Sequence, residues 1–163
     1  MANQHVTPDG LGKILYSLLA DTEEHVTNRY SAELQQLGVP QRVFTAELLA
    51  LRWIAFDFAL TLAFGQGPKR AAILDPYLDC LHENIDPSLE RSLEQRICQY
   101  AIVLNNADSN PSLQMGGALA RFLFERESRP EQDSVTIGVI GATEFAITVE
   151  GVQRMLNSVI IDW

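Results

Sequence analysis

The stretch from Phe44 to Phe64 constrains the fold more than any other part of the chain. It reads FTAELLALRWIAFDFALTLAF, and only Glu47, Arg52 and Asp57 interrupt its apolar character. It is long enough for about six helical turns. A helix that is apolar on every side has to be buried on every side. We therefore predict that a helix over 41–64 forms the centre of an all-α fold.

The length and composition favour one globular domain. A chain of 163 residues falls within the usual size of a single domain and can bury a core without help from a metal or a disulfide. A hydrophobic content of 47% with 20% charged residues excludes a disordered or collagen-like chain. We predict a single α-helical domain over 1–163, built as a bundle of about six helices.

Four prolines mark expected helix starts. Each follows a side chain that can cap a helix, and proline at the first helical position has no N–H group to leave unpaired. These pairs are Thr7-Pro8, Asp75-Pro76, Asp86-Pro87 and Asn110-Pro111.

Apolar spacing and glycines supply the remaining boundaries. We expect helices over 8–37, 41–64, 68–84, 87–106 and 118–127. The helix over 68–84 contains Pro76, so it is either two pieces, 68–74 and 76–84, or one kinked helix. Gly116 is either a break before the helix over 118–127 or a place where another backbone comes close.

The C-terminal region fits two structures. Alternating residues over 144–150 match a β-hairpin that turns near Gly141, whereas an apolar stripe through Val135, Phe145 and Val152 matches a helix. An isolated two-stranded hairpin is marginally stable, so we favour the helix and keep a short β-hairpin at 135–150 as the alternative. Residues 152–161 are expected to be helical in both cases. Gly138, Gly141 and Ala142 would then let a second helix approach closely.

The net charge of −9 limits the classes of partner that the protein is expected to bind. It repels nucleic acid phosphates and anionic membrane surfaces, and it suits a basic protein partner. The stretch 44–64 is the only membrane candidate that we recognise, and Arg52 and Asp57 near its middle argue against a span. We therefore expect neither nucleic acid nor membrane binding.

The N-terminal residues and the two cysteines both lead us to expect a cytoplasmic location. The first residues lack the basic and apolar segments of a secretory signal. Cys80 and Cys98 have no CxxC spacing, and on adjacent helices turning near 85–86 they would be offset too far for a disulfide. We expect free thiols in a reducing compartment.

The three charges of the central stretch are the first candidate site. Glu47 and Asp57 share one sector of the helix and Arg52 points away from it, so they cannot satisfy one another. Each then needs a partner from another helix, and the arginines that could pair with Glu47 or Asp57 are Arg91, Arg96 and Arg121. Alternatively, Glu47, Arg52 and Asp57 line a polar pocket in which Arg52 or Asp57 orients a ligand.

The second candidate is an anion site at the start of the helix over 68–84. Gly67 precedes that start, and Lys69 and Arg70 lie in its first turn, where cations are unfavourable against the helix dipole. A phosphate or carboxylate bound at the helix N-terminus would explain them. The alternative is a helix stop, a turn and a helix start with no ligand.

Histidine spacing gives little support for a metal. Asp79-x-x-His82 and Asp21-x-x-x-His25 each lie on one helix face, and a site with three histidines would need His5 from the N-terminal tail. Both pairs also fit solvated ion pairs on a helix surface. We assign no metal, no cofactor and no catalytic residue.

The function expected from these patterns is a non-catalytic protein-interaction module with an acidic helical surface. It would act as an adaptor, an inhibitor or an oligomeric partner, including a homodimer that packs across 41–64. The alternative is a small-molecule-binding or enzymatic helical bundle with a polar pocket around Glu47, Arg52 and Asp57.

Overall fold

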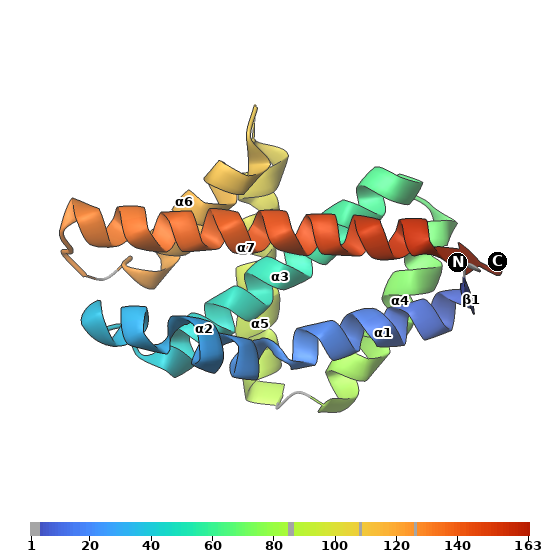
Figure 1. The fold of residues 1–163 in the computed structure, drawn as a ribbon, viewed down its shortest axis with the longest axis horizontal. Helices are drawn as coiled ribbons and strands as arrows, with labels where there is room; N and C mark the ends of the chain where they lie inside the picture. The colour runs from blue at the N-terminus through green and yellow to red at the C-terminus, as the bar shows by residue number, and fades with distance from the viewer. Residues whose placement is uncertain (1–3, 85–86, 108, 126) are drawn as a thin grey trace.

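A computed structural model describes residues 4–84, 87–107, 109–125 and 127–163, and it has the predicted all-α architecture (Figure 1). In chain order the helices are α1 (Pro8–Ala20), α2 (Thr22–Gln36), α3 (Gln41–Phe64), α4 (Pro68–Asn84), α5 (Pro87–Asn105), α6 (Pro111–Leu123) and α7 (Glu131–Ser158). Two short strands, β1 (Gln4–Val6) and β2 (Val159–Ile161), join the two ends of the chain.

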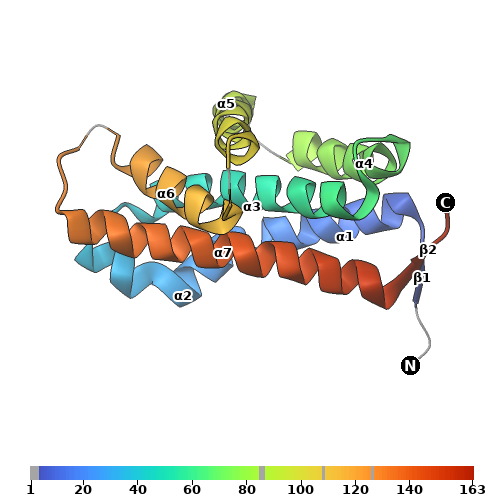
Figure 2. The same ribbon diagram turned by 90° about the horizontal axis from the view of Figure 1, so that it is seen from above.

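Helix α3 is the centre of the fold, as predicted. It packs against α1, α2, α4, α5, α6 and α7. Its buried apolar residues are Phe44, Leu48, Ala50, Leu51, Ile54, Ala55, Phe56, Ala59 and Leu60. Figure 2 shows α5 almost end-on above α3, so α5 crosses α3 while α7 extends beneath it. The predicted helix end is also observed, because Gly65 follows α3 with the positive φ of 67° that glycine tolerates.

The expected helix over 8–37 is two helices. The chain breaks at Asp21, and the Thr22 hydroxyl donates a hydrogen bond to the carbonyl oxygen of Leu19 at 2.6 Å. Neither glycine nor proline marks this break, and the apolar spacing continues through it. The break changes the direction of the chain and sets α2 beside the N-terminal half of α3.

Three of the four predicted proline-linked starts are confirmed, because α1, α5 and α6 begin at Pro8, Pro87 and Pro111. Thr7 caps α1 by accepting from the Gly10 N–H at 3.1 Å, and Asn110 caps α6 by accepting from the Leu113 N–H at 3.2 Å. The prediction of a start at Asp75 is wrong: of the two alternatives for 68–84, the structure has the single helix, α4, with Pro76 inside it. Asp86 lies outside the described residues. Helix α6 begins at Pro111, so the prediction of a helix over 118–127 placed it too late.

Small residues let α6 and α7 pack backbone to backbone. A β-carbon on Gly116 would collide with the carbonyl oxygen of Gly138 and lie 2.7 Å from the backbone nitrogen of Ala142. A β-carbon on Gly141 would lie 2.8 Å from a methyl group of Leu119. The predicted close approach at Gly138, Gly141 and Ala142 is therefore confirmed, and Gly116 is the matching residue on α6.

The C-terminal region is a helix, so the hairpin alternative is wrong. Its helix α7 extends to Ser158, and the prediction that 152–161 is helical is wrong at its end. Residues Val159–Ile161 instead pair in parallel with Gln4–Val6, with His5 opposite Ile160. The β-branched run at 159–161 finds a strand partner only because the first residues of the chain lie beside it.

The membrane expectation for 44–64 also needs correction. Within the described residues, α7 is the helix whose length and composition would allow it to cross a membrane. That finding rests on length and composition alone. In this fold α7 packs against α3 and α6 and carries the buried Glu144 in its middle.

Candidate functional site

The charged side chains of α3 do not converge on one pocket. Each pairs with a different helix: Arg52 with Glu144 of α7, Asp57 with Arg70 of α4, and Glu47 with Arg96 of α5. Of the arginines proposed from the sequence, Arg96 is the one that pairs with Glu47. The other two pairs were not foreseen.

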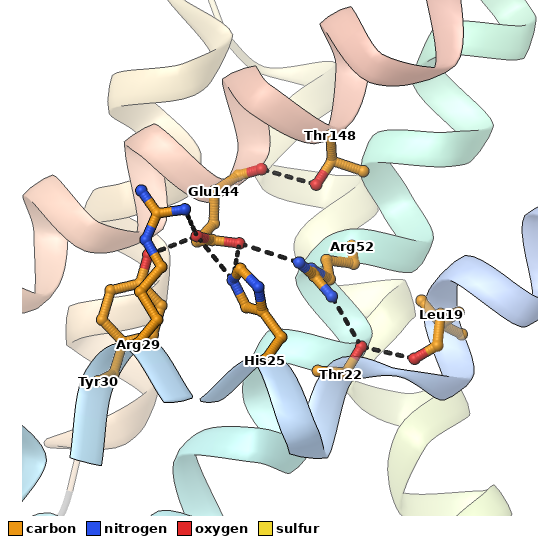
Figure 3. Close-up of polar contacts among 8 residues, drawn as sticks. All are labelled: Leu19, Thr22, His25, Arg29, Tyr30, Arg52, Glu144 and Thr148. Atoms are coloured by element: carbon orange, nitrogen blue, oxygen red, sulfur yellow. Dashed lines mark hydrogen bonds and ion pairs between the residues drawn. The ribbon is translucent and has the colours of Figure 1, made fainter. Parts of the chain in front are cut away.

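Glu144 is the most enclosed carboxylate described, with 1% of the residue exposed. Figure 3 shows it projecting from α7 towards side chains of α2 and α3. We call this group the Glu144 cluster, and its members are Thr22, His25, Arg29, Tyr30, Arg52 and Glu144. The Tyr30 hydroxyl donates to Glu144 Oε1, and His25 Nε2 lies 3.1 Å from both carboxylate oxygens.

Two arginines complete the Glu144 cluster. Arg52 contacts Glu144 Oε2 at 3.3 Å and donates to the Thr22 hydroxyl at 3.1 Å, while Arg29 lies 3.8 Å from Glu144 Oε1. The cluster joins three helices through one carboxylate. His25, which the sequence paired with Asp21 as a possible metal ligand, contacts Glu144 instead.

The pKa values in the Glu144 cluster follow from these contacts. Burial alone would raise the pKa of Glu144, but hydrogen bonds from Tyr30 and His25, together with the charges of His25 and Arg52, lower it below its ordinary value. Burial, and then the hydrogen bond to Glu144, raises the pKa of Tyr30 well above its ordinary value. The cluster thus favours an ionised Glu144 beside a neutral Tyr30.

Glu47 occupies a different environment on the α5 side of α3. Its Oε1 lies 2.8 Å from Arg96 Nε, and its Oε2 accepts from the Tyr100 hydroxyl at 3.3 Å. Burial raises the pKa of Glu47, and Arg96 and Tyr100 offset only part of this effect. Arg96 is shared, because it also lies 3.9 Å from Glu125 and covers the ring of Phe122.

A groove of about 940 Å³ borders Glu47. It follows the N-terminal half of α3 between α2 and α5, and its volume is typical of ligand-binding clefts. Its lining residues are Glu23, Gln41, Arg42, Val43, Thr45, Ala46, Glu47, Leu49, Ser92, Leu93 and Arg96. Val43 is 41% exposed and Ala46 is also exposed, so this side of the central helix is not covered.

A second, smaller depression of about 370 Å³ adjoins the groove through Glu23. It is lined by Ala20, Asp21, Glu23, Glu24 and Thr27, at the junction of α1 and α2. Three of these five side chains are carboxylates. The groove therefore meets an acidic surface at the start of α2.

The residues of the predicted anion site have other contacts. Arg70 pairs with Asp57, and the Lys69 ammonium lies 4.6 Å from the centre of the Trp163 ring. Gly67 precedes α4 and is half-buried. Protein groups thus account for both cations, and the anion site remains a prediction.

The histidines also contact carboxylates singly. His5 lies 3.0 Å from Asp162, and His82 pairs with Glu90 rather than with Asp79. Within the described residues, no three histidine, cysteine or acidic side chains are grouped as metal ligands. Cys80 and Cys98 are both free thiols, as predicted.

Glu47, Arg52 and Asp57 were predicted to line one polar pocket. Of these three residues, only Glu47 lines the groove. Sequence reasoning missed Glu144, because the predicted apolar stripe through Val135, Phe145 and Val152 left it outside. That stripe is wrong at its start: Val135 is 50% exposed, and the buried face of α7 instead carries Ile137, Gly141, Glu144, Phe145 and Val152. A carboxylate on this buried face requires a cation such as Arg52. Arg52 itself was the available signal, because a buried cation on the central helix requires an acid from another helix.

Comparison with family models, curated proteins and solved structures found no match for this chain.

Proposed function

We propose that this protein is a non-catalytic protein-interaction module that binds its partner on the uncovered side of α3. The observation that carries the proposal is the groove of about 940 Å³ along the N-terminal half of α3, the helix that packs against all the other described helices. An apolar helix needs cover on all sides, and here Val43 and Ala46 lack it. A bound protein segment would supply that cover.

The charged groups around the groove support a binding role rather than a reactive one. Glu47 and Arg96 neutralise each other across its wall, and Tyr100 holds the second oxygen of Glu47. A carboxylate that two partners hold in place gives the wall of the groove a defined shape. The ion pair would also discriminate between partners, because a segment that separates Glu47 from Arg96 has to replace the lost interaction.

Site-specific crosslinking tests the proposal. The photoreactive residue p-benzoylphenylalanine is placed at Val43 in the groove, or at Ile102, which is 61% exposed on α5 and outside the groove lining. We expect a discrete adduct in the native cells from position 43 alone. Its partner is identified by mass spectrometry, purified, and bound to the protein in solution.

Two matched substitutions on α3 complete the test. Ala46→Glu places a carboxylate in the groove, and Ala63→Glu places the same group at an exposed position near the other end of the helix. Binding of the purified partner should be lost only in Ala46→Glu. Equal binding by both variants, or an adduct of the same partner from position 102, would remove the groove as the interaction surface.

Small-molecule binding is the second candidate, and Thr45 is the observation that favours it. Thr45 lines the groove, and within the described residues its buried hydroxyl has no hydrogen-bond partner. Together with Glu47 and Arg96 it would give a ligand three polar anchors among apolar walls. A ligand of this kind would raise the melting temperature of the wild type and not of Ala46→Glu.

A further inference from the structure

The uncovered side of α3 has the shape of a helix-binding groove. Its apolar positions, Val43, Ala46 and Leu49, recur every three residues, so they lie on one face of α3. Ala46 in the middle is small and lets another backbone approach, and Leu93 of α5 forms an apolar wall. The arrangement suits ridges of side chains from a further helix.

The length of the groove sets the length of the occupant. Its lining on α3 extends from Gln41 to Leu49, which corresponds to about 12 Å at 1.5 Å per residue. Apolar anchors at positions i and i+7 of a partner helix are about 10.5 Å apart, with a third anchor between them at i+3 or i+4. Two to three turns of an amphipathic helix therefore span the groove.

The charges around the groove are unbalanced. Glu47 and Arg96 are paired, and Arg42 is the other cation in the lining. Against these cations stand the carboxylates of Glu23 in the lining, Asp21 and Glu24 in the adjoining depression, and Glu125 beside Arg96. The rim is thus negative on the α2 side, in a chain whose net charge is −9. It complements basic side chains at the edge of the bound helix.

We propose that the groove binds a basic amphipathic helix of a partner protein, with apolar side chains on Val43, Ala46 and Leu49 and with lysine or arginine over Asp21, Glu23 and Glu24. This inference rests on the proposed function and adds the class of partner to it. The apolar face supplies the affinity, and the acidic rim sets the orientation of the helix and its rate of association.

The test uses three synthetic peptides of about 15 residues, long enough to form a helix on the surface. One is a leucine–lysine amphipathic helix, one replaces every lysine with glutamate, and one scrambles the leucine–lysine sequence. Fluorescence anisotropy measures their binding to the full chain. We expect the leucine–lysine helix to bind at least about tenfold more tightly than either of the others.

Charge-matched variants locate the binding site. Glu23→Gln with Glu24→Gln removes two carboxylates from the rim, and Glu131→Gln with Glu150→Gln removes two exposed carboxylates from α7. The two variants carry the same net charge. We expect about 3–10-fold weaker peptide binding for the first and a change within about twofold for the second. Ala46→Glu should weaken binding at least about 30-fold, and Ala63→Glu should not.

Each other outcome overturns a defined part of the inference. Equal binding of the scrambled peptide, or equal weakening by the two charge variants, means general attraction to an acidic protein and overturns the site. Tighter binding of the leucine–glutamate helix that Ala46→Glu abolishes overturns the basic class and leaves the groove as an interaction surface. No binding of any peptide overturns the helical occupant, while crosslinking from Val43 tests the proposed function separately.

Discussion

On its α7 side, α3 meets a neighbour at close range, whereas on its α5 side the neighbour crosses over and leaves a groove. Glu144 on the first side has tyrosine, histidine and two arginines around it, and its pKa is lowered. Glu47 on the second side has Arg96 and Tyr100, and its pKa is raised. Both carboxylates are buried, so the number and quality of their partners decide the sign of each shift.

The two sides of α3 differ in how readily their contacts can change. On the α7 side, His25, Tyr30, Arg29 and Arg52 already contact the buried Glu144. The α5 side has an unfilled groove, and its buried carboxylate is only partly compensated. A binding surface is expected at the second kind of place, because binding there can improve the local interactions.

The largest expected effect comes from Glu144→Gln. It leaves Arg52, which is mostly buried, without its counter-charge, and we expect a loss of about 3–5 kcal/mol in the free energy of unfolding. Urea denaturation measures it. Glu150→Gln, on the exposed face of the same helix, should stay within about 0.5 kcal/mol. A small effect for Glu144→Gln would mean that the two sides of α3 do not differ as described.

A smaller effect is expected at the α6–α7 contact. Gly116→Ala places a β-carbon against Gly138 and Ala142, and we expect it to destabilise the protein by about 1–3 kcal/mol. The matched control is its neighbour, because a β-carbon on Gly117 meets nothing within 4 Å. Gly117→Ala should stabilise the protein by about 0.5–1 kcal/mol. Melting curves that move in the same direction for both variants would contradict the close packing on this side.

The smallest effect is expected for Glu47→Gln, about 1 kcal/mol or less at neutral pH, because Arg96 keeps Glu125 and Gln99 as partners. The stability that Glu47 contributes depends on pH with the opposite sign to that of Glu144. The raised pKa of Glu47 adds stability below its ordinary value of 4.5, and this contribution is lost as the pH rises through the folded-state pKa. The lowered pKa of Glu144 adds stability above 4.5 that is lost as the pH falls through its folded-state pKa.

Urea midpoints between pH 3 and pH 7 would therefore separate the two carboxylates. The stability difference between wild type and Glu144→Gln should shrink as the pH falls. The difference between wild type and Glu47→Gln should move in favour of the wild type over the same range. Parallel pH profiles for the two variants would mean that the carboxylates share one kind of environment.

The central helix and the class of fold could be predicted because they depend on local patterns. The apolar character of 44–64 requires burial whatever surrounds it, and Thr7 and Asn110 act on their own helix ends. The break at Asp21 was not predicted, because neither glycine nor proline marks it, and the hydrogen bond that Thr22 accepts there comes from Arg52, thirty positions away. Likewise, the groove depends on how α5 crosses α3, which no local pattern specifies.

The candidate site was predicted only in part for the same reason. Glu47 was identified as a buried charge in need of an arginine, and Arg96 was among those proposed. Asp57 and Arg70 are thirteen positions apart, across a turn whose geometry the sequence did not reveal. A buried charge can be recognised from a helical pattern, whereas its partner depends on the packing of whole helices.

The small sheet at the ends of the chain bears on how the molecule folds. His5 and Asp162 are 157 positions apart, and the strands that hold them run parallel. Pairing them closes a loop over almost the whole chain, and the entropy of that closure is recovered only when the helices between them are already packed. We therefore expect the two-stranded sheet to form late in folding and to open early in unfolding, and exchange of its amide hydrogens would test this order.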